Sequence, residues 1–309
     1  MSLQEHLEPR RGNGAGGAVD INIPEHIKRR RTRAQAKGLR GAIREILEDS
    51  HPQTVRQVYY ALSVRGLIQK TEIEYKMSVV RLLVEMRERG QVPFDWIADH
   101  TRSTYGPTTY SSLAECLKTT SKKYRRRVWD DAQCRIFVFC EKDALAAVLG
   151  QETDPYDVPL CVARGYSSIS YLHEIAKVIE SAGRPAYVYH FGDHDPSGQD
   201  AARDTEQKLR RYAPGATIHF ERVAVSAKQI EDWNLPGRPT KTKDTRAKKF
   251  GRDTSVELDA IPVDKLRALV RSRIKRHVDK KRLKGLRLIE KRERKSLQKM
   301  AAAHAEARL

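Results

Sequence analysis

Two short stretches of the chain each combine an apolar run with acidic residues at its end. Residues 135–141 read Arg-Ile-Phe-Val-Phe-Cys-Glu, and residues 186–198 read Ala-Tyr-Val-Tyr-His-Phe-Gly-Asp-His-Asp-Pro-Ser-Gly. Each apolar run is rich in β-branched and aromatic residues, which predicts a buried strand. Glu141 would follow the first strand, and Asp193 and Asp195 would follow the second. The sequence therefore predicts three carboxylates at the ends of two strands.

Three carboxylates at one edge of a sheet favour a bound cation. In an open parallel α/β sheet, ligands bind where the carboxyl ends of the strands meet. Carboxylates that share a site raise one another's pKa values, and a hard divalent cation with oxygen ligands relieves this repulsion. A lone Asp-X-Asp segment is also a common turn, so the prediction depends on the two acidic ends together. We expect Glu141, Asp193 and Asp195 to be the ligands of a Mg²⁺ ion.

The acidic stretches also resemble a known domain. Glu-Lys-Asp-Ala-Leu begins at Glu141, Arg-Gly-Tyr begins at Arg164, and Gly-Asp-His-Asp-Pro-Ser-Gly begins at Gly192. This set resembles the Toprim domain of topoisomerases, primases and some nucleases, in particular that of the topoisomerase VI A subunit and its meiotic double-strand-break relatives. The resemblance covers about residues 54–270 and implies an α/β fold, with a winged-helix domain before a Rossmann-like Toprim domain.

A tyrosine pair adds a second chemical feature. Val-Arg-Gln-Val-Tyr-Tyr ends at Tyr60. Helical periodicity groups Tyr59 with the apolar residues and puts Tyr60 on the exposed polar face beside Arg56, four residues before it. A guanidinium favours the phenolate form and can contact a phosphate. On spacing alone, however, Tyr60 reads as an ordinary surface tyrosine.

The same segment is similar to the Arg-X-X-Tyr-Tyr segment of the topoisomerase VI A family, in which the second tyrosine becomes linked to a 5′ phosphate of DNA. The resemblance implies that Tyr60 is the nucleophile, that Arg56 supports it, and that Glu141 is a metal ligand or a base. It also implies a homodimer, since tyrosine and metal come from different protomers, and a separate GHKL-type ATPase B subunit. The chain itself has no G-x-x-x-x-G-K-[ST] motif and could not couple ATP alone.

Composition divides the chain into five expected segments. Residues 1–35 are expected to be a disordered basic arm, and residues 36–105 a winged-helix DNA-binding domain. Residues 106–134 form a basic connector, and residues 135–262 form the Toprim domain with an irregular extension. Residues 263–309 are expected to form a basic C-terminal helix.

The segment before the Toprim domain reads as three helices and a hairpin. Helical periodicity begins near Ala36, a second helix is capped by Thr54 and closed by Gly66, and a third spans residues 72–89. Alternation over residues 92–100 predicts the hairpin. This order describes a winged helix, which places one helix in the DNA major groove. The candidate DNA contacts on the third helix and the connector are Lys76, Arg81, Arg87, Arg125, Arg126 and Arg127.

The charge balance favours a polyanionic partner. Lys and Arg number 59 against 40 Asp and Glu, a net charge of +19. Cations that meet phosphates release counterions, so we expect double-stranded DNA as the partner, with an anionic membrane surface as the competing interpretation. No apolar run approaches the length of a membrane span. The four cysteines show no C-x-x-C spacing, and we expect a cytoplasmic, nucleoid-associated protein without zinc.

Three functions stay open at this point. The first is a Mg²⁺-dependent transesterase that cleaves duplex DNA through Tyr60. The second is a hydrolytic Toprim nuclease in which Tyr60 is a bystander, and the third is a DNA-binding protein without catalysis. His194 inside the acidic loop and the basic tail depart from the family pattern. Three further acids are expected to be structural or to cap helices: Asp244, Glu257 and Asp259.

Overall fold

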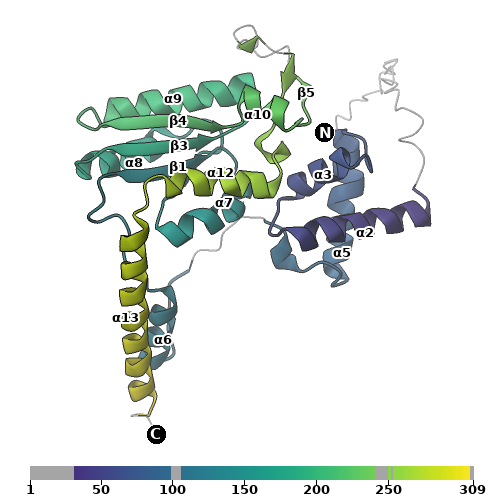
Figure 1. Cartoon of the computed structure of the whole chain (residues 1–309). Coiled ribbons are helices and arrows are strands. Elements are labelled where there is room, and N and C mark those ends of the chain that lie inside the picture. The colour runs from purple at the N-terminus through teal and green to yellow at the C-terminus, as the bar shows by residue number, and fades with distance from the viewer. Residues whose placement is uncertain (1–30, 99–105, 241–249, 252, 307–309) are drawn as a thin grey trace, which may run out of the picture. The chain divides into compact units, whose positions relative to one another are not determined.

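The computed structural model describes residues 31–98, 106–240, 250–251 and 253–306 (Figure 1). Its contacts divide the chain into two units, residues 1–39 and residues 40–309, and the features below lie in the second. Most of the expected disordered arm lies outside the described residues. Within the described residues, no helix combines the length and apolar character needed to cross a membrane.

One parallel sheet forms the centre of the α/β fold. β1 and β3 are its two central strands and pair in register, from Arg135 opposite Ala186 to Cys140 opposite Phe191. Because their ends are level, the residues after both strands begin at the same edge of the sheet. The sheet order is β2-β1-β3-β4, with β1 (Arg135–Cys140), β2 (Leu160–Val162), β3 (Ala186–Phe191) and β4 (Ile218–Ala224), and β1 and β3 are the two strands predicted from the apolar runs.

Helices cover both faces of this sheet. On one face, Leu172 of α8 and Leu209 of α9 pack against Phe137 and Phe139 of β1. On the other face, the hydroxyl of Tyr189 lies 2.6 Å from Nε2 of His277, just after α12. The helices of this region are α7 (Ala146–Thr153), α8 (Ile169–Ser181), α9 (Pro196–Tyr212), α10 (Ala227–Asp232) and α12 (Val263–Lys275), with short 3₁₀ turns η3 (Asp143–Leu145), η4 (Asp154–Tyr156) and η5 (Leu258–Ala260) and the strand pair β5 (Arg238–Pro239) and β6 (Thr254–Ser255).

Three helical segments precede the sheet, as predicted. Thr54 caps the second with a full capping box, in which its hydroxyl accepts from the Gln57 N–H and the Gln57 side chain accepts from the Thr54 N–H. Gly66 and Gly90, with φ of 69° and 66°, follow the second and third. The segments are α2 (Arg33–Asp49), α3 (Val55–Val64) and a continuous run of α4 (Glu72–Glu74), the π-helical η1 (Tyr75–Val80) and α5 (Arg81–Glu88).

The predicted hairpin over residues 92–100 is wrong for the part that is described. Residues 94–96 form the 3₁₀ turn η2 (Phe94–Trp96), and Ile97 makes only a single bridge to Gln53. Pro93 has no N–H to donate to a strand ladder, which works against pairing here. Residues 99 and 100 lie outside the described residues. Three helical segments are therefore present, whereas a wing is not part of the described structure.

Two helices were predicted differently from what is observed. The connector holds a helix, α6 (Leu113–Lys123), followed by extended chain. The single helix expected from Val263 onward is broken at residues 276–279 into α12 and α13 (Lys280–Glu306). Asp279 caps the second part by accepting hydrogen bonds from the N–H groups of Lys281 and Arg282.

Candidate active site

The acidic ends of β1 and β3 meet as predicted. Glu141 follows β1 directly, and its N–H donates to the Phe191 carbonyl at 2.9 Å. The Asp193 N–H in turn donates to Oε2 of Glu141 at 3.0 Å. Asp195 begins α9 as its N-cap, where Oδ1 accepts from the Gly198 N–H at 2.7 Å. A hydrogen bond between main chain and side chain thus fixes the acidic loop against Glu141.

Two glycines leave the space that the Glu141 carboxylate occupies. A Cβ atom at Gly192 would stand 2.7 Å from Oε2 of Glu141. A Cβ atom at Gly198 would stand 2.5 Å from the Asp193 carbonyl and 3.1 Å from the same Oε2. The contacts at 2.7 and 2.5 Å are closer than real Cβ atoms approach, so a side chain at either position would force the Glu141 carboxylate or the Asp193 main chain to shift.

Burial and mutual repulsion act on the carboxylates. Burial raises the pKa of Glu141 to about 7, and the charges of Asp193 and Asp195 add to the rise. Burial also raises the pKa of Asp193. A divalent cation bound between buried carboxylates that repel one another would offset this repulsion and favour their charged form. The donor set therefore fits Mg²⁺, although the described residues contain no group of three His, Cys, Asp or Glu already arranged as a metal shell.

Lys142, the residue after Glu141, forms ion pairs with the acidic loop and with two acids later in the chain. Its Nζ lies 2.8 Å from Asp259, 3.2 Å from Asp193 and 3.4 Å from Glu257. Burial acts to lower its pKa, but these three carboxylates outweigh burial and the pKa is raised. Glu257 and Asp259 are thus structural acids, as predicted, that position Lys142 beside the site. Asp244 lies outside the described residues.

Removing the charge of Lys142 should destabilise the fold. We expect Lys142→Met to lower the free energy of unfolding by about 3 kcal/mol, because three carboxylates would lose their shared cation. Urea denaturation at pH 7 measures the change. Lys177→Met is the matched control, since 58% of the Lys177 side chain is exposed, and should stay within about 0.5 kcal/mol. Equal losses in the two variants would contradict the role of Lys142.

Tyr60 does not lie on an exposed face, and that prediction is wrong. It is 4% exposed, as Tyr59 is, and Lys70 Nζ lies 5.4 Å from its ring centre. Helical periodicity puts Tyr60 on an exposed face only if α3 packs on one side. In the structure α3 contacts both η1 and η5, and Tyr60 is buried. Burial, and then Glu257, raise the pKa of Tyr60, while Lys142, Arg56 and Arg238 act to lower it. In this conformation the phenol is protonated but is surrounded by cations.

Arg56 and Lys142 line a common cavity. The Arg56 guanidinium lies 4.2 Å from the Tyr75 ring centre and forms ion pairs with Glu72 at 3.4 Å and Glu257 at 3.7 Å. A cavity of about 430 Å³ is lined by Arg56, Arg87 and Lys142, together with residues of α3, η1 and η3. The lining also includes the acids Asp143, Glu257 and Asp259, and it does not include Glu141, Asp193, Asp195 or Tyr60. A phosphate in this cavity would therefore lie near cations of the helical segment and of the sheet edge, and also near these acids.

The remaining predicted DNA contacts are divided between two places. Lys76 and Arg81 are exposed on the third helical segment. Arg125 and Arg126 instead form ion pairs with acids of α13, to Glu290 at 3.4 Å and to Glu293 at 2.6 Å. Arg127 is 80% exposed.

Sequence reasoning missed Arg222 and Arg238. Arg222 donates to the Asp193 and Val225 carbonyls, and burial lowers its pKa. Arg238 lies 2.7 Å from Glu257. Neither arginine stands in a recognisable motif, and the acidic-site contacts of both, Arg222 with Asp193 and Arg238 with Glu257, join residues well apart in sequence.

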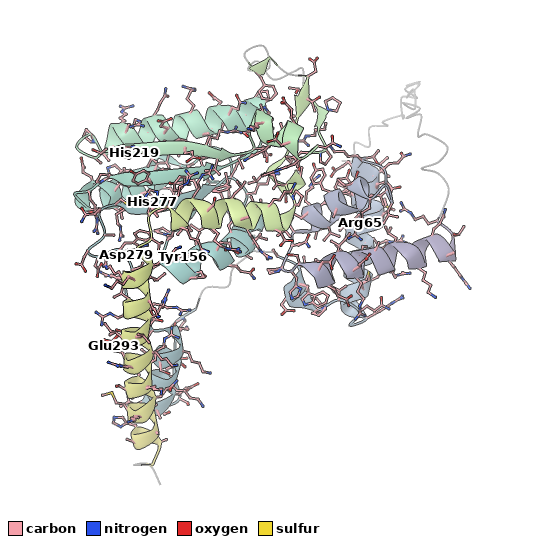
Figure 2. The ribbon with its side chains drawn as sticks, viewed as in Figure 1. Arg65, Tyr156, His219, His277, Asp279 and Glu293 are labelled. Carbon is pink, nitrogen blue, oxygen red and sulfur yellow. The ribbon has the colours of Figure 1, made fainter. Side chains whose placement is uncertain are left out.

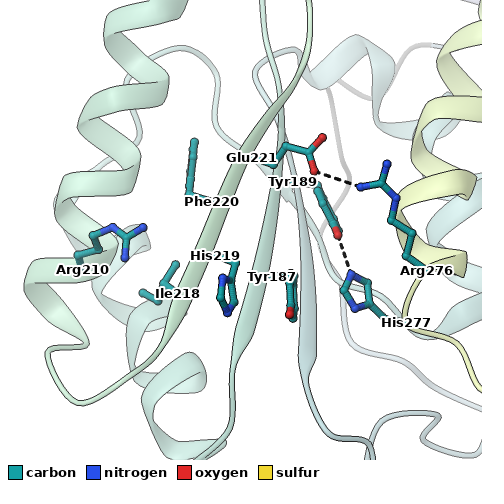
Figure 3. Close-up of a pocket in the computed structure, with 9 residues that line it drawn as sticks. All are labelled: Tyr187, Tyr189, Arg210, Ile218, His219, Phe220, Glu221, Arg276 and His277. Carbon is teal, nitrogen blue, oxygen red and sulfur yellow. Dashed lines mark hydrogen bonds and ion pairs between the residues drawn. The ribbon is translucent and has the colours of Figure 1, made fainter.

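A second cavity, of about 500 Å³, lies along β4 and the end of α12 (Figure 3). There the Tyr187 ring stacks on His219 with centroids 4.5 Å apart, and Arg276 faces Glu221 at 3.6 Å. Glu141, Asp193 and Asp195 are not among the residues that line it, so it is separate from the acidic edge.

Comparison with known proteins adds no assignment to this geometry. No protein-family model matches the chain, and no curated protein matches it significantly.

Proposed function

We propose that the chain is a Mg²⁺-dependent DNA transesterase that cleaves duplex DNA through Tyr60 and leaves a 5′-phosphotyrosyl link. The observation that carries the proposal is the position of Lys142. Lys142 directly follows Glu141 at the acidic edge. Its charge acts to lower the pKa of Tyr60, and its side chain lines the same cavity as Arg56. The resemblance to the topoisomerase VI A family supports the same assignment.

Each residue has a role in this proposal. Glu141, Asp193 and Asp195 would hold Mg²⁺, which when bound neutralises charge that develops on the scissile phosphate. Lys142 and Arg222 keep the acidic loop in place. Arg56 and Arg87 would contact the phosphate, and the Tyr60 oxygen would attack it while its proton passes to a base. The bond from phosphorus to the 3′ oxygen of the neighbouring nucleotide breaks, and that oxygen leaves as a 3′ hydroxyl after taking up a proton. Glu141, with a pKa of about 7, can alternatively accept a proton at neutral pH.

The burial of Tyr60 requires a movement before reaction. With 4% of the residue exposed, the phenol must leave the contacts of α3 to reach DNA. A homodimer in which DNA binding displaces α3 toward the acidic edge of the second protomer satisfies this requirement. A separate GHKL-type ATPase subunit and a nucleoid location belong to the same proposal.

Hydrolysis is the second candidate, and the same burial favours it. A phenol with a raised pKa that is shielded from solvent is a poor nucleophile in the present conformation. In this alternative, water activated at the acidic edge attacks the phosphate, and Tyr60 is only a buried packing residue of α3.

A covalent trap separates the candidates. The full chain is incubated with supercoiled plasmid and Mg²⁺ and then denatured, and the DNA is analysed with and without protease digestion. Transesterification predicts broken DNA that enters the gel only after protease, and EDTA added from the start prevents it. Breaks with free ends would instead establish hydrolysis. If neither Mg²⁺ nor Mn²⁺ supports any break, both enzymatic candidates fail and a DNA-binding protein without catalysis remains.

A further inference from the structure

The helices α6 and α13 pack side by side (Figure 1). Together with the extended residues 124–127, they form a two-helix arm made of residues 113–127 and 280–306. Ser121 of α6 and Ala301 of α13 are buried in the seam between the helices. Arg287 attaches the arm to the Toprim domain by donating to the Pro155 carbonyl.

Acidic residues of α13 are turned into this seam. Glu290 is 4% exposed and accepts from the Arg126 N–H at 3.0 Å and from Arg287 at 2.7 Å. Glu293, labelled in Figure 2, accepts from the Tyr124 hydroxyl at 2.8 Å and from Arg126 Nη1 at 2.6 Å. The negative charges in the middle of α13 are therefore already compensated inside the arm.

The opposite side of α13 carries only positive charge over five turns. Its successive cations are separated by one, three, four or seven residues, which at 3.6 residues per turn places all of them on one helix face. All are exposed, and within the described part of the chain they form no recorded ion pair. Leu288, which is 56% exposed, lies in the same row. We call this row the lysine stripe, and its cations are Lys281, Lys284, Lys291, Arg292, Lys295 and Lys299.

Three physical features identify the partner. A merely solvated helix face carries charges of both signs that pair at i, i+4, whereas Glu290 pairs with Arg287 and Arg294 and the stripe itself contains no acid. At 1.5 Å per residue, the stripe is about 27 Å long. Over that length a DNA duplex presents on the order of 16 phosphates. A membrane-surface helix needs a broad free apolar face, whereas among the described residues of α13 only three large apolar side chains, those of Leu288, Ile289 and Met300, are exposed.

We infer that the lysine stripe of the two-helix arm binds the phosphate backbone of duplex DNA without reading its sequence. This rests on the proposed function only in taking duplex DNA as the partner. Arg125 and Arg126 contribute by compensating Glu290 and Glu293 and so keeping acids away from the stripe, not by contacting DNA.

The test removes three stripe charges from the full chain. A triple variant, Lys284→Gln, Lys291→Gln and Lys295→Gln, is compared with a control of equal charge change at exposed positions, Lys177→Gln, Arg211→Gln and Lys228→Gln. Binding to a 30-base-pair duplex is followed by fluorescence anisotropy in EDTA across a salt series. The stripe variant should bind at least tenfold more weakly at about 50 mM salt. The slope of log K against log salt should fall by about 2.7, or 0.9 per lost phosphate contact, while the control changes little.

Two further measurements separate loss of charge from loss of structure in the stripe variant. Lys→Arg at the same three positions keeps the charge and should restore both affinity and slope. Circular dichroism should show unchanged helix content, because the stripe side chains are exposed. Equal losses in stripe variant and control would overturn the inference. So would unchanged DNA binding together with lost binding to phosphatidylserine vesicles, which would identify a membrane surface instead.

The outcome is independent of catalysis. EDTA prevents metal-dependent cleavage during the binding assay, so a stripe effect remains valid if the covalent trap finds no transesterification. Conversely, metal-dependent phosphotyrosyl breaks together with a null result for the stripe variant would reject only the arm as the DNA contact.

Discussion

Glu141→Gln should remove metal-dependent cleavage and, in the metal-free protein, raise the free energy of unfolding at pH 8 by up to about 3 kcal/mol. The first effect follows because Glu141 is the carboxylate around which the acidic loop is built, and loss of such a group costs at least about 100-fold in rate. The second follows because the folded chain holds the pKa of Glu141 at about 7, against 4.5 for the free side chain.

The change in the free energy of unfolding caused by Glu141→Gln depends on pH. A carboxyl group whose pKa is raised in the folded state contributes its full stability below about pH 4.5, and that contribution is lost as the pH rises through about 7. Wild type and Glu141→Gln should therefore differ least near pH 4.5 and most above pH 7. Gln retains an oxygen that can accept from the Asp193 N–H, so the loop contact is kept.

Urea denaturation in EDTA at pH 5 and pH 8 measures this difference. Glu45→Gln serves as the control, because 65% of the Glu45 side chain is exposed. The control should not separate from wild type by more than about 0.5 kcal/mol at either pH. A difference between wild type and Glu141→Gln that does not change with pH would contradict the buried, repelled state of Glu141.

Tyr60→Phe should lower the yield of the covalent protein–DNA adduct by at least about 1,000-fold, because the variant lacks the attacking oxygen. The ring stays buried, so the fold and DNA binding should be retained. The adduct is measured on denaturing gels with a duplex labelled at its 3′ ends, since the label then stays with the strand whose 5′ phosphate is linked to protein. Tyr59→Phe is the matched control, as its hydroxyl makes only a 3.3 Å bond to the Thr71 carbonyl.

Two results would reject the nucleophile assignment. An adduct of equal yield in Tyr60→Phe would mean that a different residue attacks the phosphate. Free-ended breaks that persist in Tyr60→Phe and disappear in Glu141→Gln would select hydrolysis.

Local patterns predicted the parts of this fold that depend on neighbours in sequence. The apolar runs that became β1 and β3 carry their own strand signal, and Thr54 with Gln57 carries the helix cap. Because strands in register end at one edge, the meeting of Glu141 with the Asp193 loop could also be predicted.

The hairpin predicted over residues 92–100 is wrong for a local reason at Pro93, whereas the wrong prediction for Tyr60 concerns contacts between distant parts of the chain. Tyr60 is buried because η5, about 200 residues later, covers α3 together with η1. Arg125 and Arg126 read as free cations until α13 brings Glu290 and Glu293 against them. The periodicity of one segment does not contain such partners, so it missed the burial of Tyr60 and the ion pairs of Arg125 and Arg126, although 57% of the Arg125 side chain is exposed as expected.

Cation binding at the acidic edge is the claim on which the proposed chemistry depends. It is tested most directly by titrating the metal-free protein with Mn²⁺, which accepts the same oxygen ligands as Mg²⁺, in a calorimeter. We predict one bound ion per wild-type chain, no binding in Glu141→Gln, and wild-type binding in Glu45→Gln. Equal Mn²⁺ binding by wild type and Glu141→Gln, or none by either, would contradict the account.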